Sequence, residues 1–178
     1  MDYVEQNQLE HSRENLHGEA AIEKIRALVD NTRSCFFCTA TAVDGSTGAR
    51  PMSVQDVDAE GNLWFLSARD SHKDEELTID PRVRLFFQGT DHGDFLEING
   101  YGAVSQDRDK IAQLWKPVMK TWFSEGPDDP RISVIKVTAT DGYYWETRHG
   151  LVIASIKMLV GTVTGKPMDD SVEGKLRL

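Results

Sequence analysis

Cationic and hydroxyl side chains stand at the ends of short apolar runs between residues 50 and 88. Arg50 opens this segment, Ser67 closes the apolar run 63–67, and Lys73 follows shortly after it. Proteins bind a phosphate with N–H and O–H donors together with a charge-assisted partner such as arginine or lysine. The apolar runs supply the flat, apolar surroundings that an aromatic ring system requires. The segment therefore predicts a site for a phosphorylated aromatic cofactor.

A short helix over residues 70–79 is predicted to position Lys73. Asp70 or Ser71 would be its N-cap, and Pro81 lies just beyond its end. Ser67 would end the preceding strand, so strand end and helix start would lie close together. Free backbone N–H groups and the helix dipole favour an anion at this point. The local pattern thus favours a phosphate site.

The remaining pattern predicts a mainly β, α+β protein. Strands are expected over residues 34–43, 49–57, 63–67, 83–88, 95–105 and 132–145, and an amphipathic helix over 20–30. Residues 107–122 should be helical but broken at Pro117, and residues 151–163 fit either a helix or a seventh strand. Antiparallel strands with hairpin connections favour a closed or split barrel. We expect residues 1–18 to be a flexible arm, 19–166 the folded domain and 167–178 a loose tail.

Composition excludes several classes of function. The chain has 178 residues and a net charge of −9, which fits a single domain and disfavours nucleic-acid or anionic-lipid partners. It has no apolar run of membrane-spanning length and no signal-peptide pattern. We therefore expect a cytoplasmic protein with small-molecule partners, in which Arg50 and Lys73 form a local cationic pocket.

Other residues with chemical potential are interpreted as structural. Cys35 and Cys38 form a Cys-x-x-Cys, but in a strand their side chains point to opposite faces. A redox pair needs a helix N-terminus, and a zinc site needs further ligands. The histidines show no metal-binding spacing, so no metal is expected. Trp64 and Trp115 are interpreted as structural residues of the core or of an interface, and no side chain is assigned as a catalytic acid or base.

Five motifs occur in a specific order: Arg-Pro-Met at 50–52, Leu-Trp-Phe at 63–65, Ser-His-Lys at 71–73, Trp-Phe at 122–123 followed by Gly-Pro-Asp-Asp-Pro at 126–130, and Tyr-Tyr-Trp at 143–145. Over residues 18–166 they resemble the pyridoxamine 5′-phosphate oxidase-like flavoproteins, and in particular their general stress protein branch. The resemblance implies an antiparallel six-stranded split β-barrel that binds FMN and acts as a homodimer. An oxidoreductase role with a small-molecule electron donor or acceptor is implied as well.

The resemblance also implies a set of cofactor-binding residues. Arg50, Ser67 and Lys73 would hold the FMN phosphate, with Ser71 and His72 close by. The isoalloxazine ring would be lined by Met52, Ser53, Gln55 and Leu66. Trp145, with Trp122 as a further candidate, would come from the partner subunit, because cofactor sites of this family lie at the dimer interface.

Two departures from the family pattern bear on activity. True pyridoxamine 5′-phosphate oxidases follow the tryptophan with an Arg-x-His pair that holds the substrate, whereas apolar residues occupy the matching positions after Trp145. Gln55 also replaces a lysine of those oxidases. Vitamin B6 oxidation is therefore not expected. A non-catalytic flavin-binding or stress-linked protein and an F420-dependent reductase on the same fold stay open, while haem would need an axial ligand that the sequence does not offer.

Overall fold

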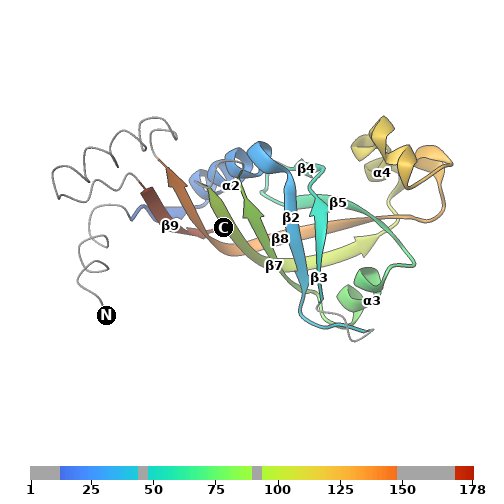
Figure 1. Ribbon diagram of the computed structural model, residues 1–178, viewed down its shortest axis with the longest axis horizontal. Coiled ribbons are helices and arrows are strands. Elements are labelled where there is room, and N and C mark those ends of the chain that lie inside the picture. The colour runs from blue at the N-terminus through green and yellow to red at the C-terminus, as the bar shows by residue number, and fades with distance from the viewer. Residues whose placement is uncertain (1–12, 44–47, 90–93, 148–170) are drawn as a thin grey trace, which may run out of the picture.

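The computed structural model describes residues 13–43, 48–89, 94–147 and 171–178. Its strands form one nine-stranded sheet, in which the main path runs β1-β9-β8-β7-β6-β2-β3 and β5 joins β4 to β8 (Figure 1). The strands are β1 (Leu16–His17), β2 (Ser34–Thr39), β3 (Ala49–Ser53), β4 (Asp56–Val57), β5 (Leu63–Ala68), β6 (Arg82–Gln88), β7 (Phe95–Ser105), β8 (Ile132–Thr147) and β9 (Ser171–Arg177). The helices are α2 (Glu19–Thr32), α3 (His72–Ile79), α4 (Arg108–Leu114), η1 (Pro117–Thr121) and η2 (Gly126–Asp128).

Alternation of apolar and polar residues builds the core face of the sheet. In β6, Val83, Leu85 and Phe87 are buried while the residues between them are exposed, as expected for a strand with one face in the core. Phe37 of β2 packs edge-on against Phe65 of β5, with ring centroids 5.3 Å apart. The buried face of helix α2 packs into this same core, and a second, smaller core forms beneath α4.

Strand β8 joins the two ends of the molecule. Along one edge, residues 134–145 of β8 pair with β7. Along the other edge, β8 pairs first with β5 and then with β9. A register shift between Asn99 and Gly100 of β7 introduces the irregularity that lets these long strands curve. Figure 1 shows α4 at one end of this strand and β9 at the other.

The prediction of a mainly β, α+β fold is confirmed, but the number of strands is not six. The described residues contain nine strands, and β1 pairs with β9 in parallel, so the sheet is mixed. The predicted strand 49–57 is divided because the chain changes partner at Val54 and Gln55. Their N–H groups donate to the carbonyls of Arg33 and Trp64 at 2.8 Å each, which takes the chain from β2 to β5.

The expected loose ends are partly wrong. Ser171–Arg177 forms β9, whose residues Val172 and Leu176 are buried in the core. Leu16 and His17, within the predicted flexible arm, pair with its other edge. Apolar burial holds both segments in the sheet. The apolar stretch 151–163 lies outside the described residues.

The break at Pro117 is confirmed. Helix α4 ends at Leu114, and the 3₁₀-helix η1 begins at Pro117 itself, where the fixed φ of proline suits a first helical turn. Asp107 caps α4 by accepting hydrogen bonds from the N–H groups of Asp109 and Lys110. None of the described helices is long and apolar enough to cross a membrane.

Candidate functional site

A cavity of about 510 Å³ lies between β3, β5, the start of α3 and the segment around η1. This volume is within the range of small-molecule sites in proteins, about 300–1,000 Å³. The cavity brings together many of the residues predicted from the sequence: Met52, Ser53, Gln55, Leu66, Ser67, Lys73 and Trp122. These residues come from four separate elements, so the fold assembles one site from dispersed motifs.

One part of the cavity is apolar and aromatic. Met52 of β3 and Leu66 of β5 line it, and Trp122 lies at its surface with 66% of the residue exposed. Met119 and Phe123 complete this part, and neither was among the residues predicted to bind the cofactor. Trp122 reaches the cavity from the same chain as Lys73, so its presence there does not require a second subunit.

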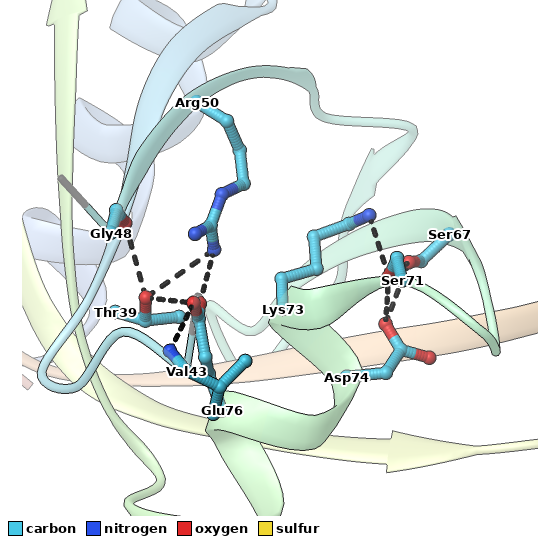
Figure 2. A network of polar contacts seen from close by, with 9 residues as sticks. All are labelled: Thr39, Val43, Gly48, Arg50, Ser67, Ser71, Lys73, Asp74 and Glu76. Carbon is cyan, nitrogen blue, oxygen red and sulfur yellow. Dashed lines mark hydrogen bonds and ion pairs between the residues drawn. The ribbon is translucent and has the colours of Figure 1, made fainter. Parts of the chain in front are cut away.

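The other part of the cavity is polar and is organised by Asp74. This residue is only 5% exposed, and its carboxylate accepts hydrogen bonds from Ser67 Oγ at 2.7 Å, Ser71 Oγ at 3.1 Å and Ser133 Oγ. Figure 2 shows Ser67, Ser71 and Lys73 gathered around this carboxylate. Sequence reasoning missed Asp74, because an acidic residue in the first turn of a helix is ordinary.

Lys73 projects from the first turn of α3 into the cavity. Its ammonium donates to Ser71 Oγ at 3.0 Å, and no ion pair is found for it within the described part of the chain. Burial lowers the pKa of Lys73, and the nearby carboxylate of Asp74 opposes this shift. Ser71 is the N-cap residue, as predicted, but its hydroxyl caps no backbone N–H and instead links Lys73 to Asp74.

Arg50 lies beside this group but does not line the cavity. Its guanidinium donates to Glu76 Oε2 at 2.7 Å and to Thr39 Oγ1 at 3.3 Å (Figure 2). Glu76 has no exposed surface. Although burial raises the pKa of Glu76, hydrogen bonds from Arg50 and Thr39 outweigh it, so that the net pKa lies below its ordinary value. The buried pair therefore stays ionised, and the proposed phosphate contact of Arg50 stays a prediction.

Arg131 is a second cation at the cavity that the sequence did not indicate. It lines the cavity and forms a two-point pair with Asp129, from Nε at 3.0 Å and from the terminal nitrogen at 2.6 Å. The hydrogen bond from Arg131 lowers the pKa of Asp129 to about 2. The Gly-Pro-Asp-Asp-Pro loop thus fixes a guanidinium at the cavity. Asp70 also lines the cavity and contributes a negative charge.

Four of the predicted residues do not line the cavity: Arg50 and Ser71, described above, and His72 and Trp145. His72 is exposed on the first turn of α3. Trp145 is 39% exposed on β8 and packs against Tyr143 with ring centroids 4.5 Å apart. Among the described residues, no side-chain hydrogen bond or ion pair joins His72 or Trp145 to the group around Lys73.

The two cysteines are free thiols in β2, with Cys35 buried and Cys38 half-buried. Burial raises the pKa of Cys35 to about 12, which makes it a poor nucleophile. Among the described residues, no cluster of His, Cys, Asp and Glu side chains could hold a metal ion.

Comparisons with known proteins agree with this architecture. Residues 20–169 match the family model described as pyridoxamine 5′-phosphate oxidase like. A chain from Jannaschia sp. CCS1 bearing the name general stress protein 26 superposes with a TM-score of 0.74 at 20% identity, over 88% of this chain and 97% of that one. The general stress FMN/FAD binding protein of Xanthomonas citri superposes with a TM-score of 0.61 at 25% identity, over 74% and 91%.

A curated relative extends the similarity beyond bacteria. Protein bli-3 of Neurospora crassa is 28% identical over 166 residues, which is 86% of this chain and 79% of the Neurospora protein. The family match covers most of the chain, including all the elements that line the cavity. The protein therefore belongs to the pyridoxamine 5′-phosphate oxidase-like family.

Proposed function

We propose that the cavity binds FMN. The observation that carries this proposal is the Lys73 ammonium, which stands at the polar part of a cavity whose other part is apolar and aromatic. A phosphorylated flavin needs both: a cation for its phosphate and apolar surfaces for its ring. The name of the Xanthomonas citri relative, which states FMN or FAD binding, supports the same cofactor class.

In this proposal Lys73 contacts the phosphate, with help from the N–H groups of His72 and Lys73 at the start of α3, where a helix leaves its first N–H groups without intrahelical partners. Met52, Leu66 and Trp122 contact the ring. The N–H groups of Val54 and Gln55 already donate within the protein. A donor role near the ring therefore falls to the Gln55 amide, whose Nε2 donates to Ser53 O at 2.9 Å and keeps a second hydrogen.

A bound flavin would supply hydride or electron transfer, and the protein would bind and orient it. We propose a role as an FMN-dependent oxidoreductase with a small-molecule electron donor or acceptor. A flavin-binding protein without turnover is the second candidate, favoured by the absence of the oxidases' Arg-x-His pair at the matching positions beyond Trp145. Consumption of NADH or NADPH by the flavin-loaded protein with an electron acceptor separates the two.

A homodimer is part of the proposal. Exposed aromatic residues lie on the outer face of the sheet, where Phe36 of β2 is in register with Phe86 of β6. Phe86 is in register with Glu97, and Glu97 with Tyr143. These cross-strand neighbours form a row across the sheet that extends from Phe36 to the Tyr143–Trp145 pair. Exposed apolar patches of this kind mark interaction surfaces. In the proposed dimer, this face is buried and the partner subunit's Trp145 approaches the flavin; light scattering measures the mass.

The test of cofactor binding is the visible spectrum of the purified protein, before and after addition of FMN and desalting. We expect retained flavin bands near roughly 375 and 450 nm, as for oxidised flavins in general. A colourless protein that also releases all added FMN would overturn the proposal. The same experiment with F420 then decides whether the deazaflavin occupies the cavity instead.

A further inference from the structure

Three serine hydroxyls converge on the buried Asp74 carboxylate. Ser67 and Ser71 donate to Oδ1 at 2.7 and 3.1 Å, and Ser133 donates to Oδ2. A hydroxyl has a single hydrogen to donate. The alternative acceptors of Ser67, the Ala68 carbonyl and Ser71 Oγ, are both more distant at 3.3 Å and uncharged, so the carboxylate is preferred. The serines therefore direct their hydrogens at Asp74, and their lone pairs face elsewhere.

The lone pair of Ser71 has a partner. Lys73 Nζ donates to Ser71 Oγ at 3.0 Å, which completes a relay from ammonium to hydroxyl to carboxylate (Figure 2). Each donor in this relay points the same way, because an ammonium only donates and a carboxylate only accepts. Lys73 is thereby held at the cavity with two N–H groups left for a ligand.

We infer that Asp74 is a positioning residue for the anionic group of the ligand and acts through Ser71 to hold Lys73. This inference rests on the proposed binding of FMN. Because a phosphate dianion has only acceptors, serines that donate to Asp74 do not donate to it. Within this cluster, Lys73 is then the side chain that donates to the phosphate, whereas Ser67 serves the buried network.

Ser71→Ala and Ser67→Ala form a matched pair that tests this inference. Both remove one hydroxyl from the same Asp74 oxygen, but only Ser71 accepts a hydrogen bond from Lys73. Dissociation constants for FMN and for riboflavin, measured by flavin fluorescence, separate the phosphate contribution from that of the ring. We expect Ser71→Ala to lower the FMN-to-riboflavin affinity ratio about fivefold to tenfold, and Ser67→Ala to change it less than about twofold.

Asp74→Asn tests the centre of the relay. The amide nitrogen of asparagine donates a hydrogen bond, so at least one serine must change from donor to acceptor. We expect the FMN-to-riboflavin affinity ratio to fall about tenfold. Ser133→Ala is the control, because Ser133 also donates to Asp74 but does not line the cavity. This variant should leave the FMN-to-riboflavin affinity ratio unchanged while lowering the melting temperature.

The outcomes are distinguishable. If Ser71→Ala or a folded Asp74→Asn binds both ligands with equally reduced or unchanged affinity, Asp74 has a merely structural role and the inference is wrong. If Ser67→Ala alone lowers the ratio, Ser67 contacts the phosphate directly, which also overturns it. A wild-type protein that does not prefer FMN to riboflavin would refute the phosphate assignment itself.

Discussion

Removal of the Glu76 charge should destabilise the protein, because this carboxylate is buried against a single guanidinium. Loss of one partner of a buried ion pair costs about 3–5 kcal/mol. Glutamine retains the shape and part of the hydrogen bonding, and the Arg50 side chain, 22% exposed, recovers some hydration. We therefore expect Glu76→Gln to lower the free energy of unfolding by about 2–3 kcal/mol, or the melting temperature by about 4–12 °C.

Urea unfolding followed by tryptophan fluorescence measures this loss, with Glu75→Gln as the control because Glu75 is an exposed neighbour on the same helix. The pKa of Glu76 is lower in the folded protein than its ordinary value of 4.5. Its contribution is therefore complete above that value and is lost as the pH falls through the lower, folded-state pKa. The difference between wild type and Glu76→Gln should shrink in that acidic range. A variant within about 0.5 kcal/mol of wild type at neutral pH would refute this account of the pair.

Further changes test the cavity and the C-terminal strand. Lys73→Ala should weaken FMN binding at least about tenfold with little effect on riboflavin or on stability; unchanged FMN affinity in a calorimetric titration would contradict the phosphate assignment. Trp122→Ala should weaken FMN and riboflavin equally, by about threefold to tenfold, because both ligands share the ring. Leu176→Ala should lower the free energy of unfolding by about 2–5 kcal/mol, whereas the exposed Lys175→Ala should not; equal urea midpoints for the two would mean that β9 contributes little to the core.

Local patterns in the sequence predicted the elements that local physics dictates. The strand Phe95–Ser105 follows from strict alternation. The break at Pro117 follows from a proline that cannot continue a helix. Ser71 as the residue before α3 follows from cap preference. These features depend on near neighbours in the chain, so one sequence is sufficient to predict them.

Features that depend on distant residues could not be predicted in this way. Nothing near Asp74 in the sequence indicates that Ser133 donates to it, and nothing near Arg50 indicates that Glu76 removes it from the cavity. The strand β9 did leave a signal, since Val172 and Leu176 alternate with charged residues. Gly174 interrupts that pattern and made the segment resemble a tail, because glycine weakens the strand signal.

The position of β9 between β8 and β1 bears on how the chain folds during synthesis. Leu16 and His17 are synthesised long before their sheet partners Leu176 and Arg177. Until then this edge of β8 is unpaired over Asp141–Thr147, and an unpaired strand edge is a template for association with other chains. Completion of the sheet therefore waits for the synthesis of β9, and chains that lack β9 should be the species that depend most on chaperones.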